Sequence, residues 1–140
     1  LESALKMGET IHIPSCCYEI EEYIHGPNLQ LTPQYNVVFF DGNDGASRRV
    51  EQVYKATRKV TNRVYLISNN PQLSSDEHVL SLSDTVSSEL SPLVYLPFVQ
   101  LLSYIVSNDL HSIYQHPLLK EFKAIAAAKT ENFVNYDGDD

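Results

Sequence analysis

Two short β-rich runs in the middle of the chain enclose a segment with helical periodicity. The runs cover residues 35–40 and 63–68, and each is followed by turn-forming residues. Over about residues 45–61, side chains that can pack recur at i, i+4, i+7, i+11 and i+14, the spacing of one helix face; they are Ala46, Val50, Val53, Thr57 and Val60. A strand, a helix and a second strand in this order form a crossover between parallel strands. The sequence therefore predicts the α/β class, as a three-layer α/β/α domain with a mostly parallel sheet.

The remaining elements are predicted on either side of this unit. We expect a helix over residues 1–11, an extended segment near 15–20, a short strand over 78–82 and a helix from Ser91 to near Asn108. The uncharged run 93–106 is interpreted as a buried helix packed on the sheet, because it is shorter than the roughly 20 residues of a membrane span. Ligands of such sheets bind at the carboxyl ends of the strands, where we expect residues 41–44.

The charge balance argues against one class of partner. The chain has 10 basic and 18 acidic residues and a formal net charge of −8, whereas nucleic-acid binding needs clustered Lys and Arg to neutralise phosphates. With 140 residues and 43% hydrophobic content, the chain can bury the core of one compact domain. No signal peptide or membrane span is recognised, so we expect a cytoplasmic protein without nucleic-acid or membrane partners.

Cys16 and Cys17 are adjacent and are the chain's two cysteines. A disulfide between sequence neighbours is strained, and two cysteines without a suitably spaced histidine make a poor zinc site. We therefore interpret both as buried, reduced thiols. No metal and no cofactor is expected.

Three charged residues near the N-terminus share one face of the first predicted helix. Glu2, Lys6 and Glu9 are spaced i, i+4 and i+7, and His25 follows on a turn formed by Gly26 and Pro27. A carboxylate base with a histidine and a lysine nearby is suited to moving a proton next to a carbonyl group. The alternative is an ordinary surface pair on a helix, worth about 0.2–0.5 kcal/mol.

Two motifs in this region resemble the sugar isomerase (SIS) domain family. Residues 2–9 read E-S-A-L-K-M-G-E and residues 18–27 read Y-E-I-E-E-Y-I-H-G-P. They are similar to the E-x-A-L-K-x-x-E helix and the G-E-x-x-H-G-P turn of the isomerase half of glucosamine-6-phosphate synthase, with Glu21 in place of the glycine. Residues 41–48 resemble the G-N-D turn of fructosamine-6-phosphate deglycases, and residues 100–104 a Q-L-L-A-Y helix near the family's C-terminus. The resemblance covers most of residues 1–117.

The resemblance implies a role for each matching residue. Glu9 holds the position of the family's catalytic base, and His25 that of the residue that assists ring opening. Lys6 and Glu2 are the substrate-binding candidates on the same helix. Lys120 is the candidate for the family's C-terminal lysine, although the Pro-Arg pair that precedes that lysine is absent here.

The resemblance also implies the organisation of the whole protein. Residues 1–140 correspond to a C-terminal SIS subdomain, a fragment of a longer two-SIS protein whose preceding half carries the phosphate-binding loop. The full-length protein is expected to be a sugar-phosphate isomerase or a fructosamine-6-phosphate deglycase, which moves a proton between C1 and C2 of a phosphorylated ketose or fructosamine. The family's histidine comes from a neighbouring subunit, which implies a homo-oligomer, with a homodimer as the simplest case. The alternative left open is a non-catalytic sugar-phosphate-binding module of a regulator.

Overall fold

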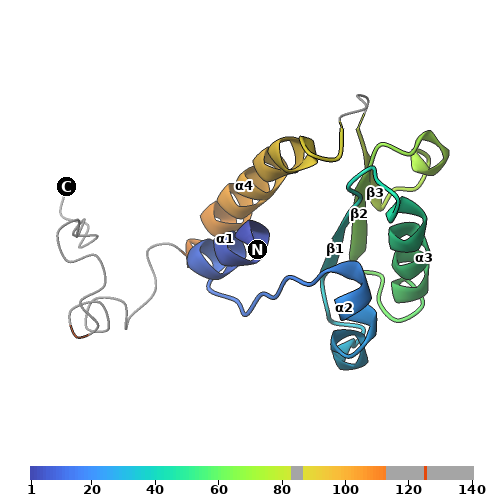
Figure 1. Cartoon of the computed structure of the whole chain (residues 1–140). Coiled ribbons are helices and arrows are strands. Elements are labelled where there is room, and N and C mark those ends of the chain that lie inside the picture. The colour runs from blue at the N-terminus through green and yellow to red at the C-terminus, as the bar shows by residue number, and fades with distance from the viewer. Residues whose placement is uncertain (83–86, 113–124, 126–140) are drawn as a thin grey trace.

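The structure is a computed structural model that describes residues 1–82, 87–112 and 125. Its elements follow the chain in the order helix, helix, strand, helix, strand, strand, helix (Figure 1). They are α1 (Glu2–Ile11), α2 (Ile20–Ile24), β1 (Val37–Phe40), α3 (Ser47–Thr57), β2 (Val64–Ser68), β3 (Val79–Ser81) and α4 (Ser91–Leu110), with short 3-10 helices at Pro27–Gln30 and Pro71–Leu73.

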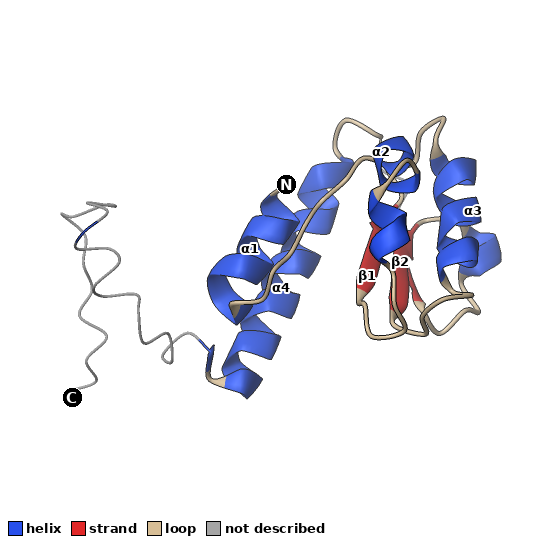
Figure 2. Ribbon diagram, turned by 90° about the horizontal axis from the view of Figure 1, so that it is seen from below, coloured by secondary structure: helices blue, strands red, loops and turns tan. Residues whose placement is uncertain are grey.

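The three described strands form one parallel sheet in the order β1-β2-β3. Val37 pairs with Val64 between the first two strands, and Leu66 pairs with Val79 between the second two. Helix α3 covers one face of the sheet, and the pair α1 and α4 lies on the other side (Figures 1 and 2). The predicted α/β class with a parallel sheet and helices on both sides is confirmed.

The core lies between the sheet and α3. Val50, Val53 and Thr57 are buried there, as the periodicity predicts, whereas Val60 lies beyond the end of the helix and is 43% exposed. Tyr54, which the predicted face omitted, is 1% exposed and meets the ring of Phe39 edge-on. A tyrosine can be buried here because its hydroxyl has polar partners at the rim of the core.

The segment predicted to be extended near residues 15–20 has no regular secondary structure up to Glu19, whose backbone is extended. The chain then enters the short helix α2 at Ile20, which the sequence analysis did not predict. The side chain of Glu19 accepts hydrogen bonds from the backbone N–H groups of Glu21 and Glu22 at 2.8 and 3.2 Å. This N-terminal cap satisfies two donors that a helix start leaves free.

Helix α4 has nearly the predicted bounds but is more exposed than predicted. It runs for 20 residues and packs along α1 rather than across the sheet. Its contact with the sheet is made near its start, where Tyr95 meets the ring of Phe40 at 5.7 Å between centroids. The interpretation of residues 93–106 as a buried helix is therefore wrong, since Leu93 and Leu101 are 68% and 58% exposed. By length and composition alone, α4 could cross a membrane.

Candidate functional site

The three charged residues of α1 lie together on its surface, as their spacing predicts. Lys6 Nζ donates to Glu9 Oε2 at 2.9 Å and lies 3.6 Å from Glu2 Oε1. The hydrogen bond to Glu9 is the main reason why the pKa of the Lys6 ammonium is raised. The side chains of Glu2 and Glu9 remain about half exposed, at 49% and 51%. The triad therefore offers two solvent-accessible carboxylates held by one cation.

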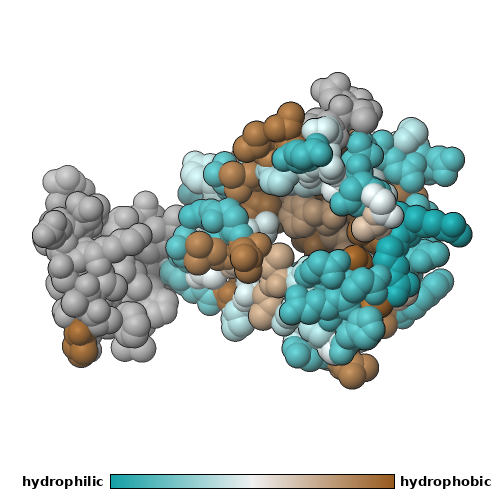
Figure 3. Space-filling model, in the orientation of Figure 1, coloured by the Kyte–Doolittle hydropathy of each residue, from teal (hydrophilic) through white to brown (hydrophobic). Residues whose placement is uncertain are grey.

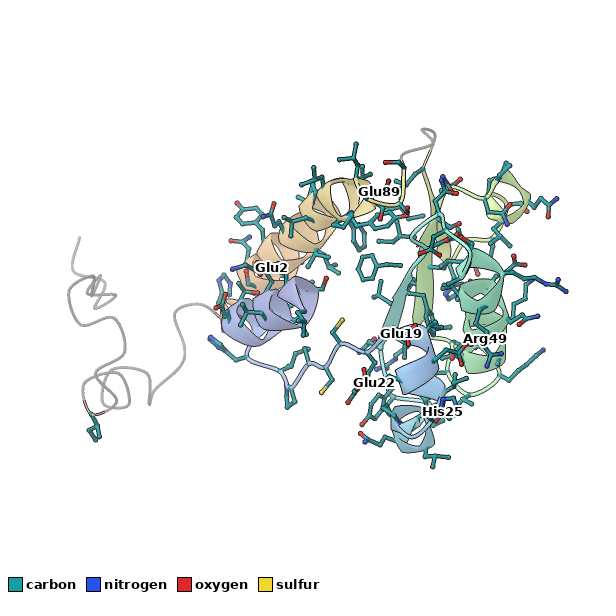
Figure 4. All side chains as sticks on the ribbon, viewed as in Figure 1. Glu2, Glu19, Glu22, His25, Arg49 and Glu89 are labelled. Atoms are coloured by element: carbon teal, nitrogen blue, oxygen red, sulfur yellow. The ribbon has the colours of Figure 1, made fainter. Side chains whose placement is uncertain are left out.

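His25 lies in a different part of the molecule. It forms the C-cap of α2, and its Nδ1 lies 2.7 Å from the carbonyl oxygen of Glu21. Figure 4 draws Glu2 on the α1–α4 pair and His25 at the end of α2, on the far side of the sheet's first strand. Among the described residues, His25 makes no hydrogen bond or ion pair with Glu2, Lys6 or Glu9. Lys120, the remaining site candidate, lies outside the described residues.

An ion pair that the sequence analysis missed fixes α2 against α3. Arg49 Nε donates to Glu21 Oε1 at 2.9 Å, across 28 residues of chain. The sequence did not reveal this pairing because α2 itself was not predicted. Since Glu21 also offers its carbonyl oxygen to His25, Arg49 holds the residue that orients the His25 ring.

A second polar cluster lies at the carboxyl ends of β1 and β2, where residues 41–44 were expected. Asp41 is 5% exposed. Its Oδ1 accepts hydrogen bonds from Ser47 Oγ at 2.6 Å and from the Asn43 N–H at 3.0 Å, and its Oδ2 accepts one from Ser68 Oγ at 2.7 Å. Asn43 has a positive φ of 53°, which its side chain tolerates better than most. The buried carboxylate thus joins two strand ends to the start of α3.

This cluster forms one wall of an open cleft of about 360 Å³. Glu51 and Asn70 meet in the cleft, with 3.5 Å between Asn70 Nδ2 and Glu51 Oε2. The cleft is lined by Asp41, Asn43, Ser47, Arg48, Glu51, Asn69, Asn70 and Pro71. The lining includes one cationic side chain, Arg48, and two carboxylates, Glu51 and Asp41. The Asp41 carboxylate already accepts hydrogen bonds from groups within the protein.

The two cysteines are exposed, so the interpretation of buried thiols is wrong. They lie in the connection between α1 and α2, where most of the neighbouring residues are exposed as well. Both are free thiols, as expected. Among the residues that the structure describes, no three His, Cys, Asp or Glu side chains gather in a way that could hold a metal ion.

Comparison with known proteins concerns the fold of the chain. No family model and no curated protein matches the sequence. Among solved structures, the chain is similar to a protein from Clostridium difficile 630 that has been assigned as a phosphosugar isomerase, with a TM-score of 0.74 and 22% sequence identity over 86% of this chain. The chain has an SIS-like fold. It spans 34% of the length of that neighbour, and the likeness concerns the fold alone.

Proposed function

We propose that this chain is part of an enzyme that isomerises a phosphorylated sugar, with fructosamine-6-phosphate deglycation as the more specific form of the same chemistry. The observation that carries the proposal is the α1 triad, in which Lys6 holds two accessible carboxylates on one helix face. The match of residues 2–9 and 18–27 to the SIS motifs supports it, and so does the fold shared with an assigned phosphosugar isomerase.

Glu9 is the general base in this proposal. Its carboxylate removes a proton from one of the carbons C1 and C2 and returns it to the other through an enediol or an enolamine. Lys6 contacts the substrate oxygens or holds Glu9 in place, and Glu2 keeps Lys6 between two negative charges. In a deglycase, water then releases the amine; in an isomerase, the carbonyl is formed again at the neighbouring carbon.

His25 assists ring opening in this proposal, and it acts in a site shared between two subunits. Within one chain it lies apart from the triad (Figure 4), so a second subunit must bring its own His25 to Glu9. The carbonyl of Glu21 at 2.7 Å fixes the orientation of the ring. If Nδ1 carries the proton, Nε2 is left to accept one from a sugar hydroxyl.

A non-catalytic sugar-phosphate-binding module is the second candidate. The observation that favours it is the exposure of the triad, since a catalytic carboxylate works best where water is excluded. In that case the pairs of Lys6 with Glu2 and Glu9 contribute only the small stability of exposed ion pairs.

Solvent deuterium exchange separates the two candidates. We expect the full-length protein to incorporate deuterium at C1 or C2 of a ketose phosphate or fructosamine phosphate. Glu9→Gln should lower that rate about 10²–10⁴-fold, the usual contribution of a general base, while binding of the sugar phosphate is kept. Glu77→Gln is the matched control, because the Glu77 side chain is 89% exposed and lies in the turn before β3, away from α1. Binding without exchange, with no effect of Glu9→Gln, would identify the binding module instead.

A further inference from the structure

The His25 ring is attached to the helix that precedes it. Its Nδ1 lies 2.7 Å from the carbonyl oxygen of Glu21, one of the carbonyl groups that the end of a helix leaves without a backbone partner. A carbonyl oxygen can only accept a hydrogen bond, so Nδ1 must be the donor. In the neutral ring Nδ1 therefore carries the proton, and Nε2 is left as an acceptor. This contact selects one tautomer and one orientation of the ring.

The place of that ring in the molecule depends on how α2 is docked. A helix of five residues has little stability by itself, so its position must come from tertiary contacts. Three apolar side chains of α2, those of Ile20, Tyr23 and Ile24, pack against the core. The Tyr23 ring meets that of Phe39 edge-on, with 5.7 Å between their centroids. These contacts hold one face of α2 and leave the other face to be held by polar groups.

An ion pair to α3 holds this second face. Glu21 and His25 are four residues apart, so they share one side of α2, and both are exposed. Arg49 approaches Glu21 with two nitrogens: Nε lies 2.9 Å from Oε1, and Nη2 lies 3.5 Å from Oε2. Figure 4 shows Arg49 on α3 beside α2, with His25 at the end of α2. A two-point contact fixes a direction as well as a distance, which the single ammonium group of a lysine does not do.

We propose that Arg49 is a positioning residue for His25, which it holds through Glu21 as the Nδ1–H tautomer with Nε2 available to a sugar. In ring opening, Nε2 takes the proton of the anomeric hydroxyl, and the bond between the anomeric carbon and the ring oxygen breaks. The ring oxygen then takes this proton back from the imidazolium, so no other reactant is needed. This catalytic consequence rests on the proposed function, whereas the tautomer of His25 is a property of the chain itself.

The effect of Arg49 should be moderate because the ion pair is in contact with water. The side chains of Arg49 and Glu21 are 43% and 51% exposed. The space-filling view shows a mostly hydrophilic surface over α2 and α3 (Figure 3). Water and salt screen ion pairs in such surroundings. Loss of Arg49 should therefore change an equilibrium or a rate that depends on it by about two- to fivefold.

NMR of the His25 ring nitrogens in the 140-residue chain tests the proposal without any substrate. At about pH 9, where imidazole rings are neutral, we expect the wild-type ring to be mainly the Nδ1–H tautomer. Arg49→Ala should raise the ratio of the Nε2–H to the Nδ1–H tautomer about two- to fivefold. Lys55→Ala is the matched control and should leave the ratio unchanged, because it removes an exposed basic residue of α3 whose ion pair, with Glu51, lies within that helix.

Exchange of the two charges separates positioning from a simple loss of structure. Glu21→Arg combined with Arg49→Glu restores an ion pair between α2 and α3 and keeps the backbone carbonyl of residue 21, so it should return the tautomer ratio toward the wild-type value. Circular dichroism checks that each variant is folded. A wild-type ring that is mainly Nε2–H would contradict the orientation. A ratio that Arg49→Ala leaves unchanged, that Lys55→Ala changes equally, or that the double variant does not restore would overturn the role of Arg49.

Kinetics of the full-length protein test the catalytic consequence. Fructose 6-phosphate is the cyclic probe, and 5-deoxyfructose 6-phosphate is the open-chain probe because it has no hydroxyl with which to close its ring. Arg49→Ala should lower kcat/KM for the cyclic probe about two- to fivefold and leave deuterium exchange on the open-chain probe unchanged. Equal losses on both probes would show a general structural effect instead. The tautomer ratio decides whether Arg49 orients His25 even if neither probe reacts, so failure of this proposal and failure of the proposed function can be told apart.

Discussion

Asp41, the residue directly after β1, connects several elements through its hydrogen bonds. It is buried, yet its two carboxylate oxygens receive three hydrogen bonds from Ser47, Asn43 and Ser68. Hydrogen bonds to a charged group contribute about 1.5–3 kcal/mol each, which offsets the cost of taking the carboxylate out of water. The backbone carbonyl of the same residue also accepts from the hydroxyl of Tyr95, so Asp41 ties the sheet to α4 as well.

Tyr54 makes stability depend on pH on the alkaline side. Burial of its side chain and its donation to Asp76 at 2.9 Å raise its pKa to about 12. The unfolded chain loses this proton near pH 10, while the folded chain keeps it. Because the folded state then binds more protons, the stabilisation is fully present below about pH 10 and is lost as pH rises toward 12.

The variant Tyr54→Phe isolates this effect. Below pH 10 it should be less stable than the wild-type chain by about 1.5–3 kcal/mol, the usual contribution of a hydrogen bond to a charged acceptor. The difference should shrink between pH 10 and pH 12. Urea unfolding of both chains at several pH values measures it, and a difference that stays constant across this window would show that the Tyr54 hydroxyl is not held protonated by the fold.

At the scale of elements, the periodicity of α3 predicted most of its buried face. Val50, Val53 and Thr57 lie on one side of the helix and are buried, but the periodicity omitted the buried Tyr54 and included the exposed Val60. Helix α4 has apolar side chains nearly all round, so hydropathy could not show which of them would be buried. The short helix α2 was missed because its five residues depend on the cap from Glu19 and on contact with α3. Neither of these produces a helical repeat of apolar residues in the sequence.

Only part of the candidate site could be predicted from the sequence. The shared face of Glu2, Lys6 and Glu9 follows from spacing within one helix, and the structure confirms it. The link between Arg49 and Glu21 spans 28 residues and depends on tertiary packing, which spacing cannot give. The catalytic roles of Glu9 and His25 remain predictions, as does any role of Lys120.

The seam between α1 and α4 depends on small side chains. Ser107 is 1% exposed, and its hydroxyl donates back to the carbonyl of Tyr104 at 3.1 Å. Ser107→Leu should destabilise the chain by about 1–3 kcal/mol, because extra methylene groups in a close-packed seam force the helices apart. Asn108→Leu is the neighbouring control on the exposed side of the helix and should change stability by less than about 0.5 kcal/mol. Thermal or urea unfolding compares them, and equal losses in both variants would contradict a tight seam.

At the scale of the whole molecule, the main feature is that the two proposed catalytic residues, Glu9 and His25, lie in different parts of the chain. The α1 triad lies with α4 on one side of the sheet, and His25 lies beyond β1 on α2 (Figure 4). The exposed connection that includes Cys16 and Cys17 joins them. No described contact brings His25 to the triad within one chain, so a shared site between subunits is the arrangement in which both residues can act on one substrate.

Mixing two inactive variants of the full-length enzyme tests this arrangement. Glu9→Gln and His25→Ala chains should each have little activity on a cyclic sugar phosphate. In a dimer with shared sites, a mixed pair has one site with both native residues and one with neither. Random exchange makes half of the dimers mixed, so the mixture should recover about one quarter of the wild-type rate by the symmetry of a two-fold dimer. A mixture no more active than its components would show that each site uses Glu9 and His25 of the same chain.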